Sequence, residues 1–98
     1  MQKLLPYLKL SVEKNASDIF FTSNAPAMLK VEGEMLAVGK NLMTSEFIKE
    51  LTLSMLTAEQ QEFLHKNLEI DLATQAGGLG RFRVNIFQQR GSVGLGLR

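Results

Sequence analysis

Residues 80–87 read Gly-Arg-Phe-Arg-Val-Asn-Ile-Phe, and this stretch decides the fold prediction. Every second residue from 82 to 86 is apolar, while the residues between them are polar. This period of two is that of a β-strand that buries one face and leaves the other in water. The stretch therefore predicts a half-buried strand whose polar face carries both Arg81 and Arg83.

Other segments of the chain predict further strands and turns, which together with this strand would form a sheet. A glycine-rich turn, Gly-Gly-Leu-Gly at 77–80, precedes it, and the pair Glu32-Gly33 separates two short apolar runs as a hairpin turn would. The β-branched and aromatic residues at 18–22, Asp-Ile-Phe-Phe-Thr, predict a further buried strand. The predicted strands are 18–22, 28–31, 35–38, 69–74, 81–86 and 93–97.

Apolar residues that recur every three to four positions predict three helices. Thr44 or Ser45 is expected to cap the second helix, and Thr57 opens a capping box at the start of the third. Phe63 and Leu64 are expected on the apolar side of that third helix. The predicted helices are 3–14, 45–56 and 58–67.

The order α-β-β-β-α-α-β-β-β predicts an α+β domain, an antiparallel sheet covered by helices. The chain has 98 residues, of which 45% are apolar, so one domain over residues 1–98 can bury a real core. It has no cysteine, which excludes disulfides and thiolate metal sites, and a single histidine, His65. No run approaches the length of a membrane span. The chain ends at Arg98 inside the last predicted strand, and we therefore expect a piece of a longer protein.

Charge is distributed unevenly, although the net charge is only +1. Residues 1–71 hold seven lysines against ten carboxylates, a net charge of −3. Residues 72–98 hold no acid and no lysine but four arginines, a net charge of +4. These arginines are Arg81, Arg83, Arg90 and Arg98.

Several other patterns favour plain structural roles. The glycines at 77–80 and 91–96 lack the Gly-Lys-Ser/Thr ending of a P-loop, so the chain has no Walker A motif. His65 is expected on the surface. Glu69 and Asp71 share one strand face, as an acid–base pair could, but no nucleophile accompanies them, and we expect two solvated charges.

The four arginines admit two interpretations. Their planar, permanently charged guanidinium groups suit phosphate or carboxylate ligands, which favours an anion-binding or partner-binding role. Alternatively, they pair with carboxylates from the first 71 residues. Nucleic acid is not expected as the partner, because the phenylalanines of the 81–87 strand should face the core and the isoelectric point is only about 8.1.

Three segments together resemble the type IV pilus retraction ATPases, the PilT/PilU family. Residues 12–20, Val-Glu-Lys-Asn-Ala-Ser-Asp-Ile-Phe, resemble the family's Ala-Ser-Asp opening, and residues 26–33, Pro-Ala-Met-Leu-Lys-Val-Glu-Gly, resemble its first hairpin. Residues 80–87 resemble its Arg-Phe-Arg-Val strand, the most specific of the three. The segment Phe-Gln-Gln-Arg at 87–90 favours the PilU type over the PilT type.

The resemblance implies a PAS-like N-terminal domain of a hexameric secretion-type ATPase. In such motors a following RecA-like domain carries the Walker motifs, so this chain alone should not hydrolyse ATP. The resemblance assigns Arg83 and Arg98 to the nucleotide phosphates, and Arg81 and Arg90 to contacts between domains or subunits. ATP and Mg²⁺ are expected in the longer parent protein, and no cofactor or metal in this chain.

The implied partners are the protein's own RecA-like domain and neighbouring subunits of a homo-hexamer. A PilT-type partner motor and the inner-membrane platform of the pilus machine are further expected partners. The implied location is the cytoplasm, peripheral to the inner membrane. The alternative is a stand-alone PAS-like adaptor that binds a small ligand or a protein.

Overall fold

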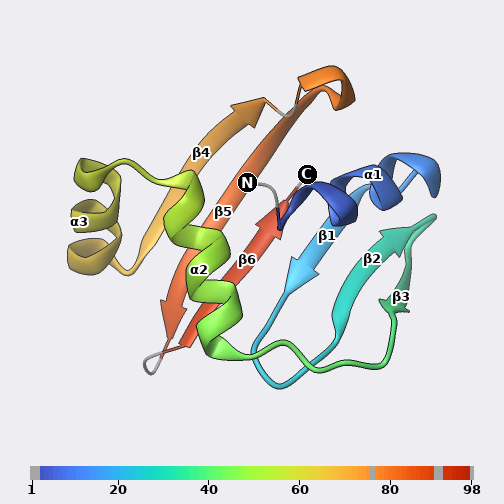
Figure 1. The fold of residues 1–98 in the computed structure, drawn as a ribbon, viewed down its shortest axis with the longest axis horizontal. Coiled ribbons are helices and arrows are strands. Elements are labelled where there is room, and N and C mark those ends of the chain that lie inside the picture. The colour runs from blue at the N-terminus through green and yellow to red at the C-terminus, as the bar shows by residue number, and fades with distance from the viewer. Residues whose placement is uncertain (1–2, 76, 90–91, 98) are drawn as a thin grey trace.

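A six-stranded antiparallel sheet forms the framework of the molecule, as the computed structural model in Figure 1 shows. The structure describes residues 3–75, 77–89 and 92–97. Their class is α+β, as the alternation of apolar and polar residues predicts. In chain order the elements are α1 (Leu5–Glu13), β1 (Asp18–Phe21), β2 (Ala27–Val31), β3 (Glu34–Val38), α2 (Ser45–Met55), α3 (Ala58–Asn67), β4 (Glu69–Gln75), the 3-10 helix η1 (Gly77–Leu79), β5 (Arg81–Gln89) and β6 (Ser92–Leu97).

The last strand, β6, lies in the middle of the sheet. The strand order is β3-β2-β1-β6-β5-β4, so β6 pairs with β1 on one side and with β5 on the other. Ile19 of β1 and Val84 of β5 both have Leu97 as their backbone partner. The N-terminal strands β1–β3 and the C-terminal hairpin β4–β5 are therefore joined into one sheet by β6 alone.

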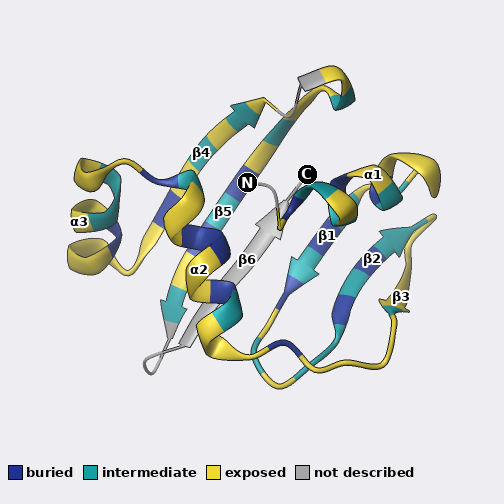
Figure 2. Cartoon of the chain, in the orientation of Figure 1, coloured by how far each residue is buried: buried dark blue, intermediate teal, exposed yellow. Residues whose placement is uncertain are grey.

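One face of the sheet carries the buried apolar residues of β1, β2, β4 and β5, and the helices pack against it. On this inner face Ile19 is paired with Leu29, and Ile70 with Ile86, all of them buried. The register explains the pattern, because directly opposed residues of an antiparallel pair point to the same side. The three helices contribute one or more residues each to this core, namely Leu8 of α1, Ile48 and Leu51 of α2, and Leu64 of α3. Figure 2 colours the buried parts of the helices and strands dark blue.

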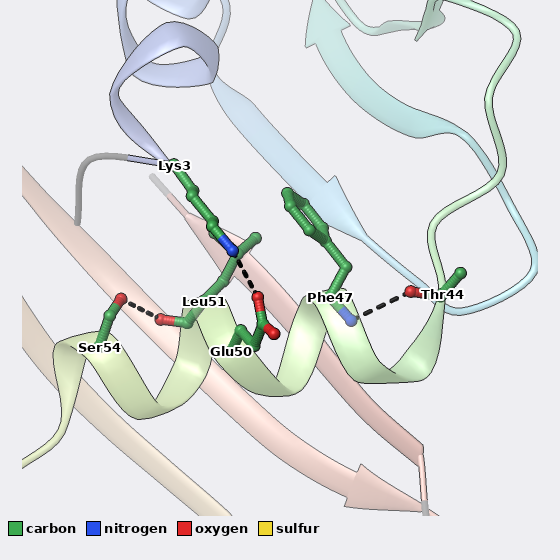
Figure 3. Close-up of polar contacts among 6 residues, drawn as sticks. All are labelled: Lys3, Thr44, Phe47, Glu50, Leu51 and Ser54. Atoms are coloured by element: carbon green, nitrogen blue, oxygen red, sulfur yellow. Dashed lines mark hydrogen bonds and ion pairs between the residues drawn. The ribbon is translucent and has the colours of Figure 1, made fainter.

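Capping hydrogen bonds set where the two middle helices begin. Oγ1 of Thr44 accepts from the Phe47 amide at 3.0 Å and starts α2, where an ion pair between Lys3 and Glu50 also ties the N-terminal segment to the helix (Figure 3). The predicted capping box of α3 is present: Thr57 Oγ1 accepts from the Gln60 amide at 3.2 Å, and Gln60 Oε1 accepts from the Thr57 amide at 2.9 Å.

Two aromatic residues do not lie where they were expected. Phe63 was expected on the apolar side of α3, but 51% of its surface is exposed, and only Leu64 enters the core. Phe87, at the end of β5, pairs with Glu69 and therefore lies on the outer face, where it is 38% exposed. A 3-10 turn at Gly77–Leu79 fills the predicted turn before β5. For Phe63 the helical period identifies a face but not whether another element covers it. Phe87 has the same parity as Arg83 and Asn85, so the period of two itself places it on the outer face.

A conservative substitution in the core measures how much the inner face contributes to stability. Ile86 has no exposed surface, and we expect Ile86→Val to lower the free energy of unfolding by about 1 kcal/mol, because it removes a buried methylene. Leu36→Val deletes the same group from a side chain that is 44% exposed, and should change stability by less than about 0.5 kcal/mol. Urea unfolding followed by circular dichroism makes the comparison, and equal losses would show that Ile86 is not in the core.

Candidate functional site on the outer face of the sheet

The two placed arginines lie beside each other on the outer face, the side of the sheet opposite the helices. Arg81 stands opposite Gln75 of β4, and Arg83 opposite Ala73. Both arginines are exposed, as their i, i+2 spacing predicts. The alanine opposite Arg83 is too short to contact or cover the guanidinium group. The structure thus presents two fixed cations on an open strand surface.

Carboxylates do lie close by on the same face. Asp71 is the diagonal neighbour of Arg83 across the β4–β5 pair, a separation of roughly 7–8 Å between Cα atoms that long side chains can bridge. Glu69 is two residues further along β4 on the same side. This is the arrangement in which neutralisation of the arginines by internal acids would be expected.

Asn85 holds both of these carboxylates instead. It stands directly opposite Asp71, and its Nδ2 donates to Oδ1 of Asp71 at 2.8 Å and to Oε1 of Glu69 at 2.9 Å. Hydrogen bonds to a charged acceptor are shorter and stronger than those between neutral groups. The amide therefore occupies one oxygen of each acid, and in the described residues neither carboxylate forms an ion pair with the neighbouring Arg83.

Among the residues that the structure describes, neither Arg81 nor Arg83 takes part in an ion pair or a side-chain hydrogen bond. The only ion pairs in those ranges are Lys3–Glu50 and Lys66–Glu62, both exposed. Of the two interpretations left open by the sequence, internal neutralisation therefore does not hold for this pair. The guanidinium groups remain available for an external anion or a partner.

The other predicted site residues fall in different places. Arg90 and Arg98 lie outside the described residues, so the structure does not place them. His65 is on the exposed side of α3, as expected, and Glu69 and Asp71 are exposed on β4. Within the described ranges, no three acidic or histidine side chains converge as metal ligands would. None of the described helices has the length and apolarity that crossing a bilayer requires.

The role of Asn85 was not predicted from the sequence. Its place between arginines and apolar residues in the 80–87 stretch indicates only that it lies on the polar face. Its importance comes from the β4–β5 register, which sets it opposite Asp71. The signal that could have found it is that Asp71 and Asn85 lie at equal distances along the chain from Gly78, so a hairpin centred on that turn sets them opposite each other.

Solved structures share this fold. The crystal structure of the pilus retraction motor PilT with bound ADP superposes with a TM-score of 0.89 at 32% identity, over 97% of this chain and 28% of PilT. The Legionella pneumophila ATPase DotB has the same fold, with a TM-score of 0.76 at 22% identity, over the whole of this chain and 27% of that one. The chain therefore has the fold of the N-terminal region of this class of ATPases.

Proteins that resemble this chain in sequence narrow the class of ATPase. The type IV pilus ATPase PilU of Pseudomonas aeruginosa is 40% identical over 93% of this chain, and the retraction ATPase PilT of the same organism is 26% identical over 89%. A twitching motility protein of Neisseria gonorrhoeae is 26% identical over 86%. The chain is homologous to the N-terminal domain of the type IV pilus ATPases PilU and PilT. The higher identity to PilU than to PilT in that one organism agrees with the PilU-type spelling of residues 87–90.

The chain spans about a quarter of the length of these relatives, 24% of PilU and 25% of PilT. No protein-family model matches it.

Replacement of Asn85 tests whether its amide controls the charges on the outer face. Asn85→Asp exchanges two donated hydrogen bonds for a third carboxylate, and we expect it to lower the free energy of unfolding by roughly 1–2 kcal/mol at low ionic strength. Molar salt should recover much of this loss, because the Debye length falls to about 3 Å. Thermal and urea unfolding at both salt concentrations measure the effect.

Asn41→Asp makes the same charge change on an exposed connector residue and serves as the control. It should leave stability nearly unchanged at either salt concentration. An equal loss in both variants, or a loss at Asn85 that salt does not reduce, would contradict the assigned role.

Proposed function

We propose that this chain is the PAS-like N-terminal domain of a hexameric motor ATPase that retracts type IV pili. The homologues named as type IV pilus ATPases and the likeness to PilT with bound ADP support this assignment. Residues 1–98 would form one domain, followed in the parent protein by a RecA-like domain. The parent would hydrolyse ATP in the cytoplasm, at the inner-membrane platform of the pilus machine and alongside a PilT-type partner motor.

The observation that carries the proposal is the exposed, unneutralised guanidinium group of Arg83. In the proposed motor, Arg83 and Arg98 contact the nucleotide phosphates, while Arg81 and Arg90 contact neighbouring domains or subunits. The outer face suits this role, since the helices occupy the opposite side of the sheet and leave it open to a second domain. Ala73 opposite Arg83 leaves room for a ligand beside the guanidinium group.

The proposed contribution of the arginines to ATP hydrolysis follows from their positive charge. ATP, bound with Mg²⁺ by the RecA-like domain, supplies the phosphoryl group that is transferred to water. A guanidinium group held against the phosphates stabilises the negative charge that develops there, and its position on a strand means that little reorganisation is needed. Arginine keeps its charge at every physiological pH, so this contribution does not vary with proton concentration.

The same contact would couple hydrolysis to movement. Arg83 belongs to one domain and the phosphates to the other, so the guanidinium group reaches them only when the two domains close. Closure of this kind completes a catalytic site, and the two domains open again as products leave. Successive closing and opening around the hexamer would then convert ATP hydrolysis into the motion that retracts the pilus.

Arg83→Ala and Arg98→Ala in the full-length ATPase test the assignment. An arginine that stabilises a transferring phosphoryl group is worth about 10³–10⁵ in kcat, and we expect losses that approach this range with folding intact. Lys40→Ala removes an exposed cation outside the proposed site and should leave turnover unchanged. Steady-state ATP hydrolysis and circular dichroism provide the measurements. Normal turnover in both arginine variants would overturn the assignment.

The isolated 98-residue chain provides a second test. Because the Walker motifs would lie in the RecA-like domain, Arg83 and Arg98 are all that this chain would offer to a nucleotide. We therefore expect calorimetric titration with ATP to detect weak binding or none. Submicromolar affinity would mean that a complete nucleotide site exists within these residues, contrary to the proposal.

A further inference from the structure

A second surface lies at the edge of the sheet, separate from the arginines. An open groove of about 820 Å³ runs between α3 and β4. One wall is a single face of α3 and the other is the first part of β4, which is an edge strand of the sheet. The residues that line this α3–β4 groove are Glu59, Gln60, Phe63 and Asn67 of α3, and Glu69, Ile70 and Asp71 of β4.

The groove exposes an aromatic ring that the core does not use. Phe63 is 51% exposed although its neighbour Leu64 is buried, and it contributes the main apolar surface of the groove together with the edge of Ile70. Exposed aromatic rings beside polar rims are typical of surfaces that bind other proteins. A ring face also attracts a cation placed over it.

The rim of the groove is negatively charged on both walls. Glu59 supplies a carboxylate from α3, and Glu69 and Asp71 supply two from β4, whereas no lysine, arginine or histidine is among the described residues that line the groove. Asn85 binds one oxygen of each β4 carboxylate and so holds both groups in place without neutralising them. In the described part of the chain these acids do not converge into a metal site.

The spacing of the two β4 carboxylates specifies the shape of a matching partner. Residues two apart on a strand point to the same side and lie roughly 6.8 Å apart along it. An extended peptide presents every second side chain at this same interval. Basic residues at alternate positions of such a peptide would therefore meet Glu69 and Asp71 together, with an aliphatic side chain between them directed at Phe63.

We propose that the α3–β4 groove binds an extended basic segment of a protein partner, in which arginine or lysine alternates with aliphatic residues. The carboxylates of Glu59, Glu69 and Asp71 pair with its cations, and Phe63 contacts its apolar side chains. The opposite charge steers the segment to the groove, and the ring contributes the short-range contact. This surface does not involve Arg83, so the inference is independent of the proposed ATPase role.

The experiment uses the 98-residue chain and a fluorescein-labelled synthetic peptide in which arginine and leucine alternate. Fluorescence anisotropy measures the affinity, and amide chemical shifts locate the contact. We expect shifts confined to α3 and the first half of β4. A peptide with glutamate in place of every arginine should not bind, because the groove would repel it.

Three variants separate the groove from general attraction between opposite charges. Glu69→Gln combined with Asp71→Asn, and separately Phe63→Ala, should each weaken binding by roughly tenfold. Glu13→Gln combined with Glu34→Gln removes the same charge from exposed positions outside the groove and should leave the affinity within about twofold. Equal weakening by the control, retention of affinity by the groove variants, or shifts centred on other elements would overturn the proposal.

Discussion

The insertion of β6 between β1 and β5 is the constraint on which the remaining architecture depends. Without this strand the β1–β3 meander and the β4–β5 hairpin would be two small sheets, each too narrow to bury the apolar faces of three helices. With it, Ile19 and Val84 belong to one sheet, because Leu97 is the backbone partner of both. The helices can then pack on a single side. Because the helices lie on one side, the other face of the sheet is left uncovered and its arginines are exposed.

On the outer face, the carboxylates of Glu69 and Asp71 do not pair with the guanidinium group of Arg83, although opposite charges attract. Asn85 contributes here without carrying any charge, since its amide engages Glu69 and Asp71 while Arg83 faces the small side chain of Ala73. One end of the strand pair is therefore cationic and the other anionic. The two ends differ in their proposed partners: phosphate groups at the arginines, and basic residues at the acidic end, where the face meets the α3–β4 groove.

Local patterns predicted the elements well, because most of them carry their own period, and α2 and α3 also carry their own capping residues. Thr57 with Gln60 identified the start of α3, and the alternation around Val84 identified the buried and exposed sides of β5. Long-range register was not predictable in this way. The exposure of Phe63, and the meeting of Asn85 with Asp71, depend on which elements become neighbours. The exposure of Arg83 followed from its strand position, whereas its lack of an acidic partner did not.

The place of β6 also determines when the domain can fold. Ile19 and its partner Leu97 stand almost a full chain length apart, so the sheet is rich in non-local contacts, which slow folding. During synthesis β1 emerges early and pairs with β2, but its other edge stays unpaired until β6 has been made. Until then its backbone N–H and C=O groups are available to other chains, which is a known route to aggregation. Completion of the sheet must therefore wait until β6 has been made, after every other strand of the sheet.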